Sequence, residues 1–176
     1  MNYTYKNISL GMLKTVAFLV FVEIIISTLF PLVGIHQFKP TINVLIVLYL
    51  AFKLNVSFLP YLILILQYIH GVFSIEGWAI GSLIGVLVAL LIRYARDMIS
   101  FTSGVSTMVV VFIFHLIWNL MFSVFVSIKM GDFGMLIGLF FDYFPEAIFV
   151  SLLSPVFYQL FDKFWRLDKN TKEVNL

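Results

Sequence analysis

Long apolar runs separated by short polar gaps organise the chain between Thr15 and Leu160. A helix needs about 20 apolar residues to cross the hydrocarbon core of a bilayer. The second and third runs are separated by a very short turn, so we interpret them as a tight helical hairpin. The pattern predicts an all-α integral membrane protein, a bundle of six helices that span at residues 13–33, 40–53, 56–74, 77–94, 105–128 and 144–162.

A further apolar segment, residues 131–143, is too short to cross a membrane. Pro145 and Glu146 are typical of the first turn of a helix, where proline is tolerated and an acid faces the positive end of the helix dipole. We therefore expect the last span to begin there, and residues 131–143 to lie along the outer interface or as a shallow re-entrant segment. The predicted organisation is one transmembrane domain, residues 1–166, followed by a polar cytoplasmic tail, residues 167–176.

The positions of the basic residues test this topology and orient it. If six spans place both termini on one side, nine of the eleven basic residues share that side. Positively charged residues favour the cytoplasmic side of a membrane. Both termini are therefore predicted to be cytoplasmic, together with Lys6, Lys14, Lys53, Arg93, Arg96, Lys163, Arg166, Lys169 and Lys172, against Lys39 and Lys129 outside.

Composition excludes several classes of protein. The chain is 62% hydrophobic and 11% charged, whereas soluble domains are about 25% charged, so an ordinary soluble fold is excluded. A net charge of +2 without a basic, aromatic-rich cluster argues against a nucleic-acid partner. The chain has no cysteine, which excludes disulfides, thiolate metal sites and cysteine nucleophiles. Because metalloprotease, nucleophile-elbow and phosphate-loop motifs are also missing, we predict no catalytic, cofactor-binding or metal-binding residues.

Glycines recur at a spacing that places them on one helix face. Gly77, Gly81 and Gly85 are four residues apart in the fourth run, and Gly134 and Gly138 repeat the spacing once. Such a stripe leaves a groove into which another helix can pack closely. Two interpretations remain open, which are internal packing of the bundle and a partner-binding face.

Polar residues inside apolar runs are costly and need a reason. For Glu23, we expect a polar partner on a neighbouring span. His115 and Asn119 share a helix face, and we interpret them as an interhelical hydrogen-bond pair rather than a proton relay. The acids near the outer rim are expected to be hydrated. A proton-coupled transporter is the alternative for the whole set, which comprises Glu23, Gln67, His70, Glu76, His115, Asn119, Asp142 and Glu146.

Three segments resemble the MreD family, the rod shape-determining membrane proteins of bacteria. The first is Phe38-Lys39-Pro40 followed by the apolar residues 45–49, which end in tyrosine. The second is residues 67–93, where Gly71 and Gly77 match two family glycines, although Gln67 replaces the usual acid. The third is the final span, where Pro155 lies in the segment SPVFY and the basic segment DKFWR follows.

This resemblance implies a non-enzymatic scaffold in the bacterial cytoplasmic (inner) membrane. Such a protein binds MreC, a single-span periplasmic protein, and acts indirectly with MreB filaments and the glycosyltransferase and transpeptidase of cell-wall elongation. The family fold is similar to that of the substrate-binding subunits of energy-coupling-factor vitamin transporters. That similarity supplies an alternative function, a vitamin-importer subunit or another small membrane transporter, with a pocket built from His70, Glu76, Trp78 and Trp118. Under the scaffold hypothesis, contacts with partners or between helices are expected at Phe38, Lys39, Pro40, Gly71, Gly77, Gly81, Gly85, Gly134 and Gly138.

Overall fold

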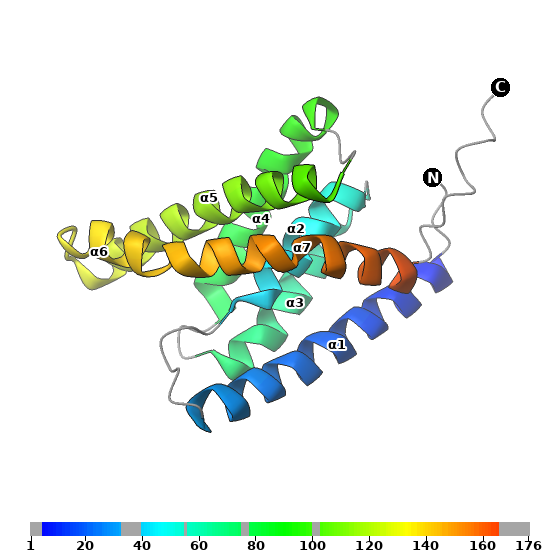
Figure 1. The fold of residues 1–176 in the computed structure, drawn as a ribbon, viewed down its shortest axis with the longest axis horizontal. Coiled ribbons are helices and arrows are strands. Elements are labelled where there is room, and N and C mark those ends of the chain that lie inside the picture. The colour runs from blue at the N-terminus through cyan, green and yellow to red at the C-terminus, as the bar shows by residue number, and fades with distance from the viewer. Residues whose placement is uncertain (1–4, 33–39, 55, 75–77, 100–102, 166–176) are drawn as a thin grey trace.

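The computed structural model describes residues 5–32, 40–54, 56–74, 78–99 and 103–165 (Figure 1). All regular structure in these residues is helical. The helices are α1 (Tyr5–Leu32), α2 (Ile42–Lys53), α3 (Leu59–Phe73), α4 (Trp78–Ala95), the short 3-10 helix η1 (Arg96–Met98), α5 (Gly104–Met130), α6 (Met135–Asp142) and α7 (Phe144–Phe164). The predicted polar tail lies outside the described residues.

The helices follow the six predicted runs but differ in length. Within the described residues, four segments are long and apolar enough to cross a membrane, namely Ile8–Phe30, Trp78–Ala95, Gly104–Met130 and Met135–Phe164. Helices α2 and α3, with 12 and 15 residues, are shorter apolar helices. At 1.5 Å per residue they extend only about 18 and 22 Å, against a hydrocarbon core of about 30 Å. The expectation of six full-length spans therefore holds, by length and composition, for four segments.

Helix α2 is the centre of the bundle. Every residue from Ile42 to Phe52 is buried, and α2 contacts α1, α3, α4, α5 and α7. A helix that is apolar on all sides is stable when it is enclosed on all sides. Because protein rather than lipid surrounds α2, its length does not have to match the thickness of a bilayer.

Contacts between helix ends define the two ends of the bundle. At one end, which we call the Lys53 end, the indole nitrogen of Trp165 donates to the hydroxyl of Thr15 at 3.1 Å and joins α7 to α1. There too, Asp162 of α7 accepts hydrogen bonds from Tyr49 (3.0 Å) and Lys53 (3.3 Å) of α2. At the opposite end, the Thr41 end, α2 begins beside the first turn of α7. Because start lies beside start and end beside end, helices α2 and α7 run parallel.

Helix α5 ends in a tight turn that leads into α6. Gly131 adopts a left-handed conformation, with φ of 71°, and its N–H bonds to the carbonyl oxygen of Ile128. Glycine is favoured at such a C-cap because it has no Cβ to clash. Figure 1 shows α6 beyond the other helices, at the far end of α5 and α7. None of the residues of α6 is buried, so most of the predicted outer segment is a short exposed helix.

The outer surface of the bundle is apolar as well as its interior. Phe21 on α1, Val109 on α5 and Val156 on α7 have exposed fractions of 62%, 53% and 68%. Large apolar surfaces of this kind are not left in contact with water by a stable protein. Together with four helices that are long and apolar enough to span, they make this chain a membrane protein.

Candidate functional site: polar groups around the start of α2

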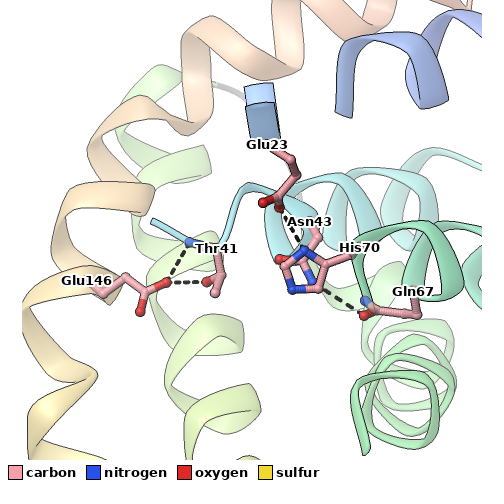
Figure 2. Close-up of polar contacts among 6 residues, drawn as sticks. All are labelled: Glu23, Thr41, Asn43, Gln67, His70 and Glu146. Carbon is pink, nitrogen blue, oxygen red and sulfur yellow. Dashed lines mark hydrogen bonds and ion pairs between the residues drawn. The ribbon is translucent and has the colours of Figure 1, made fainter. Parts of the chain in front are cut away.

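The start of the buried helix α2 needs hydrogen-bond acceptors from outside the helix. The first N–H groups of any helix lack an intrahelical partner, and here the start is enclosed by protein. Pro40 is buried, and its carbonyl oxygen accepts from the N–H of Ile42 at 2.9 Å. The N–H of Thr41 donates to Oε1 of Glu146 at 2.6 Å, and the hydroxyl of Thr41 donates to the same oxygen (Figure 2).

Glu146 therefore has a different environment from the one that the sequence suggested. We expected a hydrated carboxylate at the outer rim, but Glu146 is only 8% exposed. The reason is tertiary, because α2 begins directly against α7 and uses the carboxylate as its cap. The negative charge also lies at the positive end of the α2 dipole, which favours it. Asp142, by contrast, is exposed on α6.

His115 and Asn119 make separate contacts rather than the predicted pair. The side-chain amide of Asn119 donates to the carbonyl oxygen of Tyr143 at 3.2 Å and so joins α5 to the α6–α7 junction. His115 is fully buried, and its Nε2 lies 4.0 Å from Oε1 of Glu146. This distance is too long for a hydrogen bond, and neither ring nitrogen has a hydrogen-bond partner among the described residues.

A second carboxylate–histidine pair lies on the other side of the α2 start. Oε1 of Glu23 on α1 is 2.7 Å from Nδ1 of His70 on α3, and Glu23 is 1% exposed. Beside the pair, the amide nitrogen of Asn43 on α2 donates to Oε1 of Gln67 on α3 at 3.3 Å. Figure 2 shows these contacts and the Thr41–Glu146 contacts around the start of α2. Glu23 thus has a polar partner on another helix.

This arrangement connects the buried helix to its neighbours. Glu23 and His70 join α1 to α3, Asn43 joins α2 to α3, and Glu146 joins α2 to α7. Hydrogen bonds between helices stabilise membrane bundles modestly and select one packing. A carboxylate beside an imidazole can also hold and transfer a proton. Among the described residues, no three His, Cys, Asp or Glu side chains are placed to hold a metal ion.

The glycines of α3 and α4 lie at the contact between these two helices. A Cβ on Gly71 would lie 2.7 Å from Cβ of Trp78 and 2.8 Å from its backbone nitrogen. A Cβ on Gly81 would lie 2.6 Å from Oε1 of Gln67. Contacts this short allow no extra atom unless a neighbour moves. The absence of a side chain therefore lets α3 and α4 approach closely.

Gly85 is also in contact with helices of the chain itself, whereas the two exposed glycines of the α5–α6 segment, Gly134 and Gly138, contact no other helix. A Cβ on Gly85 would lie 2.8 Å from Cγ2 of Ile63 on α3. Side chains of α3 therefore fill the groove at Gly81 and Gly85. This agrees with the interpretation that these glycines serve internal packing of the bundle. Gly134 and Gly138 are exposed, and a Cβ on Gly138 would meet no atom within 4 Å. A Cβ on Gly134 would lie 3.0 Å from Oδ1 of Asp132, so only Gly138 of this pair faces open space.

Four of the predicted site residues lie outside the described residues, namely Phe38, Lys39, Glu76 and Gly77. Sequence reasoning in turn missed Thr41 and Asn43, which interrupt the beginning of an otherwise apolar run. It also missed Asp162, which binds Tyr49 and Lys53 across the core. The sequence signal for these residues is a polar side chain near the end of an apolar helix. Many helix ends that are hydrated show the same pattern, so it does not single out a buried contact.

We compared the chain with known protein families, curated proteins and solved structures. No protein-family model, no curated protein and no solved structure matches the chain.

Proposed function

We propose that this protein is a non-enzymatic scaffold of the bacterial inner membrane, which holds components of the cell-wall elongation machinery and binds MreC directly. The proposal rests on the MreD-like segments, Phe38-Lys39-Pro40, Gly71 and the final span around Pro155. The indirect partners are then MreB and the glycosyltransferase and transpeptidase that build lateral peptidoglycan. Membrane lipid surrounds the bundle.

The observation that carries the proposal is the exposed apolar surface of the α5–α6 turn and α6, which we call the α6 tip. Phe133, Ile137 and Phe141 are 66%, 66% and 64% exposed. Aromatic and aliphatic anchors of this kind dominate binding energy at protein interfaces. The α6 tip is therefore well suited to contact a second membrane protein near the membrane surface.

The interior supports a rigid platform. Helix α2 is buried along its length, and buried polar contacts connect its start to α3 and α7. A scaffold benefits from such an interior because binding then costs little reorganisation.

The charge distribution supports an orientation with both termini in the cytoplasm. Helices α2, α4 and α7 end in Lys53, Arg93 and Lys163 in their last turns. Positive residues favour the cytoplasmic side, so we assign the Lys53 end to the cytoplasm. The α6 tip then lies at the periplasmic surface, on the side where a protein such as MreC has its soluble domain.

The test is an affinity pull-down in mild detergent from native membranes, with mass spectrometry of the recovered proteins. We expect the wild type to recover a single-span periplasmic protein and wall synthases. The double variant Phe133→Ser/Ile137→Ser should lose at least about tenfold of that recovery, since each anchor contributes on the order of 1 kcal/mol or more. Phe21→Ser, which removes a 62% exposed aromatic from α1, is the matched control and should recover the partners normally. Equal recovery by all three proteins would reject the α6 tip as the contact surface.

One observation favours the transporter alternative. Oδ1 of Asn43 and Nε2 of Gln67 are buried without a hydrogen-bond partner among the described residues, beside the Glu23–His70 pair. Of the residues expected in a vitamin pocket, however, His70 is bound to Glu23, and the ring of Trp118 lies 3.4 Å from a Cβ placed on Gly85. A thermal-shift screen with a vitamin panel separates the functions, because a tight ligand raises the melting temperature by mass action. Recovery of ATPase subunits in the pull-down would also favour the importer.

A further inference from the structure

A cavity of about 250 Å³ opens at the Lys53 end, far from the polar groups around the start of α2. It lies between the end of α2, the turn that leads into α3, and the last turns of α4. Its walls include Ala51 and Leu54 on one side and Val86 and Ala89 on the other. Two basic residues, Arg93 and Arg96, complete the lining.

Small side chains on facing helices create this space. Ala51 on α2 and Ala89 on α4 are both buried, with exposed fractions of 3% and 6%, and their helices are in contact. Protein interiors are normally filled to the density of organic crystals. A space of this size between two packed helices is therefore large enough to hold part of a ligand.

The two arginines provide positive charge that is not paired within the part of the chain that the structure describes. Neither guanidinium forms an ion pair with a described carboxylate, whereas Lys53 nearby is paired with Asp162 at 3.2 Å. Arg93 is exposed and Arg96 is half-buried, so neither residue is closed off from a ligand that enters the cavity from outside. Guanidinium groups bind phosphate oxygens through two parallel hydrogen bonds.

The cavity changes from apolar to basic along α4. Val86 and Arg93 are seven residues apart, which corresponds to roughly 10 Å along a helix. In a phospholipid, the charged head group and the first part of the acyl chains are separated by a similar distance. Basic pockets between membrane helices on the cytoplasmic side are suited to acidic lipid head groups.

We propose that this cavity binds an anionic phospholipid of the cytoplasmic leaflet. The phosphate group bridges Arg93 and Arg96, and the first part of one acyl chain lies along Val86, Ala89 and Leu54. The lipid would fill the space between α2 and α4 and fasten the end of α4 to the buried helix. This site does not depend on the scaffold function, and the two proposals are tested by different measurements.

The experiment measures lipid binding to the purified full-length protein by native mass spectrometry and thermal shift. The probes are phosphatidylglycerol, the zwitterionic lipid phosphatidylcholine and inorganic phosphate. We expect phosphatidylglycerol to bind and to raise the melting temperature, and the other two to do neither. The double variant Arg93→Gln/Arg96→Gln should bind phosphatidylglycerol about tenfold or more weakly, because charge-assisted hydrogen bonds to phosphate are lost.

Two further variants separate this site from general surface charge. Lys163→Gln removes a positive charge at the same end of the bundle without altering the cavity lining, and it should bind phosphatidylglycerol like the wild type. Ala89→Leu fills the apolar part and should weaken binding although both arginines remain. Gel filtration checks that each variant is folded. If Ala89→Leu does not fold, the comparison of Arg93→Gln/Arg96→Gln with Lys163→Gln decides the question.

Three outcomes would overturn the proposal. The first is an equal loss of binding in Lys163→Gln, which would indicate diffuse electrostatic attraction. The second is unchanged binding in the arginine variant. The third is a thermal shift with inorganic phosphate as large as that with phosphatidylglycerol, which would identify a site for free anions rather than for lipid.

Discussion

At the scale of single residues, burial decides what a polar side chain does in this protein. Glu146 and Asp142 are four positions apart and chemically alike, yet one is 8% exposed and caps α2 while the other is exposed on α6. A buried acid that accepts N–H and O–H donors from another helix is part of the structure. An acid in contact with water contributes little to it.

These two acids allow a matched test. We expect Glu146→Ala to lower the free energy of unfolding by about 1–3 kcal/mol, because the half-buried N–H and hydroxyl of Thr41 lose their acceptor. Asp142→Ala should change it by less than about 0.5 kcal/mol, as is usual for exposed sites. Detergent-denaturation curves of the purified variants measure both values. Equal destabilisation would mean that the capping contact with Thr41 carries no net stability.

At the scale of helices, close approach and enclosure determine the arrangement. Helices α3 and α4 approach closely because Gly71 lies against the backbone of Trp78. Helix α2 is held at both ends by α7, through Glu146 at its start and through Asp162 near Lys53. The central helix is therefore attached by polar contacts at its ends and by apolar packing along its length.

Glycine substitutions test the contact between α3 and α4. Gly71→Ala should destabilise the bundle by about 1–3 kcal/mol, because the new methyl group would meet the backbone of Trp78 and force the helices apart. Gly138→Ala on α6 meets no atom within 4 Å and should be neutral or stabilising by up to about 1 kcal/mol through helix propensity. Melting temperatures in detergent compare the two variants. A neutral Gly71→Ala would show that α3 and α4 can separate without cost.

At the scale of the whole molecule, the described chain has two chemically different ends. The Lys53 end carries basic residues at the ends of α2, α4 and α7, and the lipid-binding cavity that we propose. The Thr41 end carries the buried polar contacts and, beyond them, the exposed α6 tip. This asymmetry suits a protein whose two faces meet different compartments.

Single cysteines can test the orientation without background labelling, because the chain has no cysteine of its own. Asp132→Cys lies in the exposed turn before α6, and Met98→Cys lies in η1, where Met98 is 89% exposed. In intact spheroplasts, a membrane-impermeant maleimide should label Asp132→Cys and leave Met98→Cys unlabelled until the membrane is opened. The reverse pattern would invert the proposed topology, and labelling of both would place these two positions on the same side.

The sequence predicted the helices well because their signal is local. Lys53 and Arg93 each close an apolar run, and each lies in the last turn of a helix. This correspondence does not depend on what surrounds the helix. The sequence did not predict which helix is central, since α2 and α3 are both short apolar runs and only α2 is enclosed on all sides. Nor did it separate the glycines that touch α3 from those on α6, because identical spacing occurs in both stripes.

The sequence by itself determined that this is an all-helical membrane protein, where its six main apolar helices lie and which residues are polar inside them. Those properties follow from hydrophobicity and charge along the chain. Only the tertiary structure decided that Glu146 caps α2, that Glu23 meets His70 and that Ala51 and Ala89 leave a cavity beside Arg93. Each of these depends on residues far apart in sequence, whose contact is set by how helices pack and not by the pattern within any one of them.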